Sequence, residues 1–149
     1  DSVLFDGTSI VFDKKGNVVA RATDFKEDLV VFDSDADESF KAELHTISSS
    51  DTESILKALV MGTRDYVFKC GFSKAVVGLS GGIDSAVTAC IAARALGREN
   101  VSGVFMPSQY TSKDNFEDTE ELTKNLGIEL QRIPIDSIFK EYLKKSVNT

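Results

Sequence analysis

Apolar and polar positions follow two different patterns along this 149-residue chain. In the first third, short apolar runs at residues 9–13, 17–22 and 28–33 predict β-strands. Lys14-Lys15-Gly16 separates the first two runs, and a glycine at such a turn favours an antiparallel hairpin. The pattern therefore predicts a short antiparallel β segment over residues 1–33.

The following stretch, residues 34–50, is polar and is predicted to be a linker. Helices and strands then alternate. The capping-box sequence Ser50–Glu53 predicts a helix that ends near Gly71. The further elements predicted are strands at 74–79, 101–106 and 128–133 and helices at 83–96, 114–126 and 136–145. A repeated βαβ order of this kind favours an α/β fold with a parallel sheet.

Composition and charge exclude several function classes. The net charge of −7 argues against a nucleic-acid-binding protein, and no apolar run is long enough to predict a membrane span. Cys70 and Cys90 lack metal-ligand spacing, so we expect reduced thiols in a cytoplasmic protein. His45 is the only histidine and stands in a polar stretch, so it suggests no Ser-His-Asp or Cys-His pair. The chain starts without Met on a strand-like run, so we expect a piece of a longer protein.

The most informative segment is Gly78-Leu-Ser-Gly-Gly-Ile-Asp-Ser85, at the junction of a predicted strand and a predicted helix. Ligands of open α/β sheets bind at this junction. Gly81 and Gly82 allow the backbone to approach a ligand, and successive N–H groups with the helix N-terminus favour an anion. Ser80 and Ser85 add hydroxyls for phosphate oxygens. The pattern predicts a phosphate-binding loop.

Asp84 is unusual in such a loop, because a carboxylate repels phosphates unless a cation lies between them. Mg²⁺ is the natural cation, since it binds one or two carboxylates together with phosphate and water. The alternative is that Gly81 and Gly82 only form a tight turn and a polar residue caps the helix. The loop has neither the Walker A lysine nor the Gly-x-Gly-x-x-Gly spacing of dinucleotide folds.

SGGIDS in this βαβ context resembles the ATP-pyrophosphatase group, whose members cleave ATP between the α and β phosphates and form an adenylylated intermediate. That resemblance implies an adenine nucleotide alpha-hydrolase-like, Rossmann-like fold. The flanking segments Gly62–Tyr66 (GTRDY), Val104–Ser112 (VFMPSQYTS) and Asp118–Pro134 are similar to NAD synthetases. Another amidotransferase of the group, GMP synthetase-like, or a tRNA-modifying relative stays open as an alternative.

The first third resembles the last strands of the nitrilase-like glutaminase domain of glutamine-dependent NAD synthetases. The resemblance implies three parts: the end of that domain at 1–33, a linker at 34–50, and the start of the ATP-pyrophosphatase domain at 51–149. The glutaminase Glu, Lys and nucleophilic Cys would then precede residue 1, and no catalytic residue is expected within the chain. We expect the chain alone to be inactive, or to be a non-catalytic interaction module.

The resemblance also implies a reaction and a site. ATP and Mg²⁺ would serve the amidation of deamido-NAD with ammonia from glutamine, in a cytoplasmic homo-oligomer that binds neither nucleic acid nor membrane. Asp84 would bind the metal, and Tyr66 would meet the nicotinate end of the substrate, unless Tyr66 is a half-buried packing residue. The ATP-binding residues implied are Gly78, Leu79, Ser80, Gly81, Gly82, Ile83, Asp84, Ser85 and Met106. The acidic residues Glu117, Asp118, Glu120 and Glu121 are expected to form a solvent-facing stripe.

Overall fold

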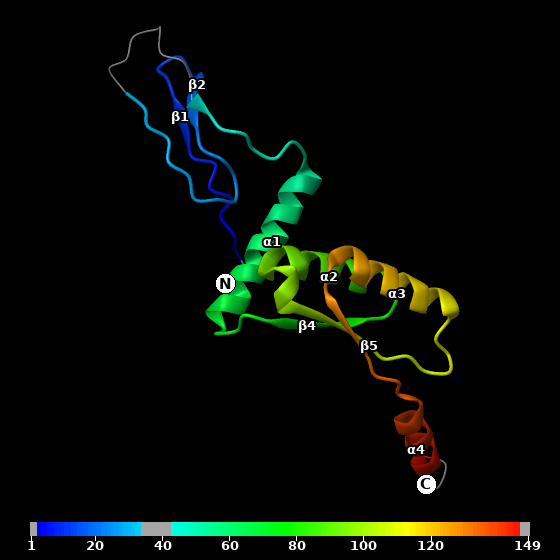
Figure 1. The fold of residues 1–149 in the computed structure, drawn as a ribbon. Helices are drawn as coiled ribbons and strands as arrows, with labels where there is room; N and C mark the ends of the chain where they lie inside the picture. The colour runs from blue at the N-terminus through cyan, green and yellow to red at the C-terminus, as the bar shows by residue number, and fades with distance from the viewer. Residues whose placement is uncertain (1–2, 34–42, 147–149) are drawn as a thin grey trace. The chain divides into compact units, whose positions relative to one another are not determined.

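The computed structural model describes residues 3–33 and 43–146 (Figure 1). The chain divides into two compact units, Asp1–Gly62 and Thr63–Thr149. The division falls inside helix α1 (Asp51–Lys69), and each unit is described by itself. Among the described residues, no helix combines the length and the apolar character needed to cross a bilayer.

The first unit begins with the predicted hairpin. Strands β1 (Ile10–Phe12) and β2 (Val18–Arg21) pair antiparallel. The turn between them is held by Asp13, whose carboxylate accepts the backbone N–H groups of Lys15 and Asn17 at 2.8 Å each. The hairpin prediction is confirmed.

The third strand is not the predicted one. Residues 28–33 form no strand, because the Asp28 carboxylate accepts the N–H groups of Thr23 (2.7 Å) and Leu29 (2.9 Å). Such local side-chain bonds compete with strand pairing, and Leu29 and Val31 are exposed by 80% and 71%. Strand β3 (Glu43–Leu44) instead pairs parallel with β2, and the sheet is therefore mixed rather than antiparallel.

Contacts between the two segments continue beyond β3. The His45 N–H donates to the Arg21 carbonyl at 2.9 Å, and the Thr23 hydroxyl donates to the Thr46 carbonyl at 2.7 Å. The described end of the predicted linker therefore lies along β2 and the residues after it. Residues 34–42 of that predicted linker lie outside the described residues, and the domain boundaries remain a prediction.

Asp24 connects three segments of the first unit. Its carboxylate is 5% exposed and accepts the Ser48 N–H (2.8 Å), the Ser48 hydroxyl and the Lys57 ammonium (3.0 Å). Burial opposes ionisation of Asp24, but the hydrogen bonds from Ser48 and Lys57 outweigh it and lower the pKa to about 2. Asp24 is therefore charged at neutral pH, and it ties α1 to the segment that precedes it.

Helix α1 begins with half of the predicted capping box. The Ser50 hydroxyl accepts the Glu53 N–H at 3.3 Å, as the pattern predicts. The Glu53 carboxylate bonds instead to the backbone N–H and the hydroxyl of Ser49, both at 2.8 Å. At the other end, Gly71 adopts a left-handed φ of +80° and terminates the helix.

The second unit is built on a parallel sheet in the order β4-β5-β6. Right-handed crossovers in such a monotonic order bring the connecting helices to one face of the sheet, and Figure 1 shows α2 and α3 on the same side of β4 and β5. The elements are β4 (Ala75–Leu79), α2 (Ile83–Leu96), a short 3₁₀ turn (Arg98–Asn100), β5 (Val101–Phe105), α3 (Lys113–Leu126), β6 (Glu129–Arg132) and α4 (Asp136–Ser146). The predicted α/β class and its parallel sheet are confirmed.

The core of this unit lies between the sheet and the two helices. Every second residue of β4 and β5 is buried there: Val77, Leu79, Val101, Gly103 and Phe105. Helix α2 contributes small buried residues, Ala89, Ala92 and Ala95, which allow it to pack closely. The core positions the carboxyl ends of β4 and β5 beside the start of α2.

Candidate functional site

The Ser80–Gly82 loop joins the carboxyl end of β4 to α2. Gly81 adopts a φ of +80°, which favours glycine, and Gly82 is the N-terminal cap of α2 with an extended backbone. The first N–H groups of a helix have no intrahelical acceptor and carry partial positive charge. The loop therefore presents donors suited to an anion at the ligand-binding edge of a parallel sheet.

Two serine hydroxyls organise the loop from within. The Ser85 hydroxyl donates to the Gly82 carbonyl at 2.9 Å and accepts the Ser80 N–H at 3.2 Å. The Ser80 hydroxyl lies 3.2 Å from that of Ser85 and accepts the Gly82 N–H, also at 3.2 Å. In this structure the two hydroxyls bond to the loop itself.

Helix α3 abuts the loop at Gly81. A Cβ at Gly81 would lie 2.7 Å from the Cα and the Cβ of Asn115, a separation that real side chains do not show. Asn115 is held in the first turn of α3, because its N–H donates to the hydroxyl of the capping residue Ser112 at 3.2 Å. Gly81 is therefore required by packing as well as by its backbone angle.

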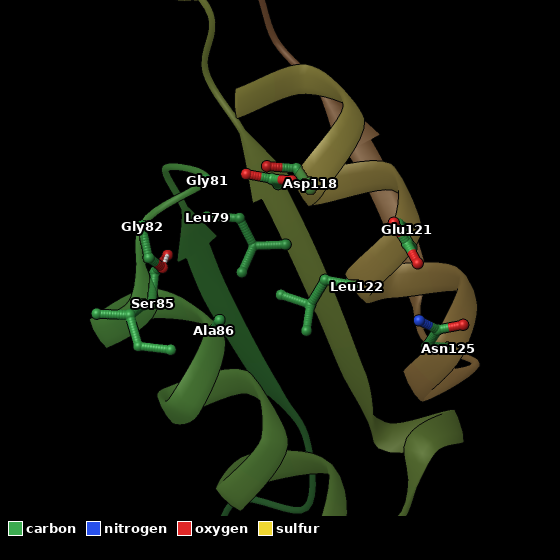
Figure 2. Close-up of a pocket in the computed structure, with 11 residues that line it drawn as sticks. Leu79, Gly81, Gly82, Ser85, Ala86, Asp118, Glu121, Leu122 and Asn125 are labelled. Carbon is green, nitrogen blue, oxygen red and sulfur yellow. Dashed lines mark hydrogen bonds between the residues drawn. The ribbon is translucent and has the colours of Figure 1, made fainter. Parts of the chain in front are cut away.

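A pocket of about 370 Å³ lies beside the loop, between the start of α2 and the side of α3 that faces it. Figure 2 shows Leu79, Ala86 and Leu122 between the two helices, with Asp118, Glu121 and Asn125 on α3 opposite the loop. Its lining is formed by Leu79, Gly81, Gly82, Ile83, Ser85, Ala86, Asp118, Thr119, Glu121, Leu122 and Asn125. An apolar floor with polar groups on its rim is typical of a small-molecule site.

The acidic stripe of α3 has two parts. Glu117 pairs with Lys113 at 2.8 Å, and Glu120 pairs with Arg132, as solvated surface residues commonly do. Asp118 and Glu121 are also exposed, but they line the pocket beside the loop. Sequence reasoning placed all four on an ordinary surface, since nothing in the sequence says that this turn of α3 faces α2.

Asp84 lies in the first turn of α2, next to the loop, and is exposed. Its backbone carbonyl accepts the Thr88 hydroxyl at 2.8 Å, while its carboxylate forms no bond within the described part of the chain. No cluster of three or more metal-ligating side chains occurs among the described residues. A cation at Asp84 would therefore need a ligand or further groups to complete its shell.

Met106 and Tyr66 lie on different elements. Met106 follows β5 directly and is 50% exposed at the carboxyl edge of the sheet. Tyr66 lies on α1 and is 72% exposed, so the alternative of a half-buried packing tyrosine is wrong. Its exposure leaves the substrate-binding role as a prediction.

His45 lies between two carboxylates, and within the described part of the chain its ring bonds to no serine or cysteine. Its Nδ1 lies 2.6 Å from a carboxylate oxygen of Asp28, and its Nε2 lies 3.2 Å from Glu43. The hydrogen bonds to Asp28 and Glu43 raise the pKa of His45. Because each carboxylate takes a different ring nitrogen, the three groups do not converge on one point. Cys70 and Cys90 are both free thiols.

Known proteins with similar sequences and structures show which family this site belongs to. The family model for NAD synthase matches residues 55–149, which include the loop, α2 and α3. The chain belongs to the NAD synthase family. The glutamine-dependent NAD(+) synthetase of a Synechocystis species is 45% identical over 95% of this chain.

Solved structures of NAD synthetases agree with that assignment. The glutamine-dependent NAD+ synthetase of Acinetobacter baumannii, in complex with ADP, matches 97% of the chain with a TM-score of 0.87 and 39% identity. The NH3-dependent NAD synthetase of Campylobacter jejuni matches 67% of the chain and 43% of its own length, with a TM-score of 0.62 and 38% identity. The chain spans 26% of the length of the Synechocystis relative and 28% of the Acinetobacter chain.

Proposed function

We propose that the Gly78–Ser85 loop binds the phosphates of ATP in a glutamine-dependent NAD synthetase that amidates deamido-NAD. The observation that carries the proposal is the loop itself, a strand-to-helix turn with two glycines and an exposed carboxylate. Its N–H donors suit phosphate, and membership of the NAD synthase family supplies the reaction. The similarity to a synthetase whose structure is a complex with ADP supports an adenine nucleotide as the ligand.

In the proposed reaction the nicotinate carboxylate of deamido-NAD attacks the α-phosphorus of ATP and pyrophosphate leaves. Ammonia from glutamine then displaces AMP from the NAD-adenylate and forms the amide. The N–H groups at the start of α2, beside the loop, hold the β and γ phosphates, where negative charge accumulates as pyrophosphate departs. Leu79 and Ile83 belong to this loop, and Met106 borders the nucleotide from the end of β5.

Asp84 fits the role of a single Mg²⁺ ligand. Its carboxylate is exposed, is unpaired within the described part of the chain, and lies in the first turn of α2, two residues after Gly82. Mg²⁺ commonly binds one or two carboxylates and completes its shell with substrate phosphates and water, so one protein ligand in this unit suffices. The bound ion would neutralise phosphate charge beside Asp84.

Tyr66 is proposed to meet the nicotinate end of deamido-NAD. Its ring is 72% exposed, so it has a face available for stacking on a flat ring. It lies on α1, close in sequence to β4, which leads into the loop. The glutaminase residues are proposed to lie in a preceding part of the intact protein.

The intact protein is proposed to be a cytoplasmic homo-oligomer that acts on small molecules and not on nucleic acid. Two free cysteines and the net charge of −7 support this proposal. Exposed apolar side chains of α1, such as Ile55 and Leu59, offer surface for further contacts. Light scattering after size exclusion measures the oligomeric state, and a monomer at micromolar concentration would contradict the proposal.

The function is tested with the intact protein, deamido-NAD, ATP, Mg²⁺ and glutamine, with NAD, AMP and pyrophosphate measured by chromatography. The proposal expects these products in equal amounts. Ammonia supplied in place of glutamine should also support the reaction, which separates the synthetase step from glutamine hydrolysis. Amidation of a different nucleotide, or no nucleotide turnover with either nitrogen source, would overturn it.

A further inference from the structure

We infer that Ser80 and Ser85 are positioning residues that set the phosphate loop before nucleotide binds, by means of a closed ring of hydrogen bonds. Its effect on ATP binding rests on the proposed function of the loop. The ring itself is a property of the ligand-free loop and can be tested without any nucleotide.

The direction of each bond in the ring follows from counting protons. A carbonyl only accepts, so the single Ser85 hydroxyl proton is donated to the Gly82 carbonyl. Ser85 therefore accepts from Ser80, and the Ser80 hydroxyl proton points to the Ser85 oxygen across 3.2 Å. The Ser80 oxygen in turn accepts the Gly82 N–H.

The ring starts and ends on the same residue. It runs from the Gly82 N–H through the two hydroxyls and back to the Gly82 carbonyl. Consecutive bonds of this kind polarise one another. Ser85 is the central member, because it also accepts the Ser80 N–H and so takes part in three hydrogen bonds.

Gly82 is the residue from which α2 starts, since its carbonyl also accepts the Ala86 N–H at 3.2 Å. A ring closed on Gly82 therefore fixes the two peptide groups on either side of this residue, at the start of the first helical turn. The N–H groups of that turn are the donors available to a phosphate. Ordering them in advance removes an entropic cost from ligand binding.

Packing supports the same loop from the other side. Gly81 contacts the Asn115 backbone at the start of α3, where a Cβ would not fit. The ring holds the N–H and the carbonyl of Gly82 in place, whereas packing against α3 leaves no room for a side chain at Gly81. The two constraints come from different elements and hold adjacent residues of the loop.

The decisive experiment is hydrogen exchange on the ligand-free intact protein, with fragmentation that resolves the amides of Ser80 and Gly82. Ser85→Ala removes the acceptor of the Ser80 N–H, so that amide should exchange about fivefold faster or more. Ser80→Ala removes the acceptor of the Gly82 N–H and should accelerate that amide in the same way. Ser85→Thr keeps the hydroxyl and should leave both amides as in the parent protein.

Kinetics give a second readout in the same variants. Ser85→Ala should raise the KM for ATP about fivefold or more with kcat nearly unchanged, because the ring acts before chemistry. Ser85→Thr should restore KM. Unchanged exchange in both alanine variants would overturn the ring, even if KM rose. Absence of NAD synthesis in the parent protein would overturn the proposed function alone, since the exchange result does not depend on turnover.

Discussion

At the scale of single residues, Gly81 and Gly71 share a left-handed backbone angle but differ in their surroundings. Both have a φ of +80°. A Cβ at Gly71 would meet nothing within 4 Å, whereas a Cβ at Gly81 would lie 2.7 Å from Asn115. The same substitution at both glycines therefore separates the free-energy cost of a side chain at this backbone angle from the cost of its contact with α3.

We expect Gly71→Ala to lower the free energy of unfolding by about 1 kcal/mol, the cost of a side chain in the left-handed region. Gly81→Ala should lower it by a further ~1–3 kcal/mol, because the loop or α3 must shift to admit the methyl group. Urea unfolding of both variants beside the parent chain measures the difference. Equal losses would mean that Asn115 does not limit the loop.

The loop could be predicted from the local sequence, because its two glycines and two serines lie close together and directly follow a predicted strand. The local sequence was insufficient for His45, because one of the two carboxylates that contact its ring is distant in the sequence. Asp28 lies 17 residues away, and its carboxylate meets the imidazole only because β3 pairs with β2. No short pattern in the sequence marks that contact.

At the scale of elements, burial and capping explain which predictions succeed. Strands β4 and β5 and helix α2 were predictable from their apolar runs, because both strands bury alternate residues against the helices. Strand β3 was not, because Glu43–Leu44 is short and exposed. Side chains of residues 21–28 also bond to His45 and Thr46, directly after β3, and propensity does not describe such contacts.

The β2–β3 region should respond to pH through His45. Both of its ring nitrogens face carboxylates, so both donate only when the ring is protonated. Arg21 of β2 also donates to the His45 carbonyl, at 3.3 Å. The folded state raises the pKa of His45 above its ordinary value of 6.5. Its contribution is therefore complete below pH 6.5 and is lost as pH rises through the raised pKa.

We expect the parent chain to lose stability from pH 6 to pH 9 relative to His45→Gln, as measured by urea unfolding at each pH. The chain has one histidine, so the variant removes all histidine titration from the comparison. The NMR titration of that single imidazole reports its pKa directly. An ordinary pKa, with parallel stability profiles for the two proteins, would show that the carboxylates do not hold the ring.

At the scale of the whole molecule, strand order determines what faces the loop. Because β4, β5 and β6 follow one another across the sheet, α2 and α3 share a face. Asp118 and Glu121 thereby reach the pocket beside the loop. The crossover rule could have indicated this neighbourhood from the predicted βαβαβ order, but the helical turn that lines the pocket follows only from the packing of α3.

The position of the loop predicts that one acidic residue of this unit, Asp84, is more important for NAD synthesis than the others. Asp84 and Asp114 are both exposed, and each lies in the first turn of its helix. Of the two, only Asp84 lies within the Gly78–Ser85 loop. Asp114 is therefore a matched control for the charge and the helix position of Asp84.

The most direct test compares NAD synthesis by Asp84→Asn and Asp114→Asn in the intact protein, with glutamine hydrolysis followed in parallel. We predict that Asp84→Asn lowers synthesis from deamido-NAD and Mg-ATP by about 100-fold or more, because it removes the proposed ligand of the Mg²⁺ ion that would offset phosphate charge. Glutamine hydrolysis should persist, and Asp114→Asn should synthesise NAD nearly as well as the parent. Undiminished synthesis by a folded Asp84→Asn protein would contradict the account.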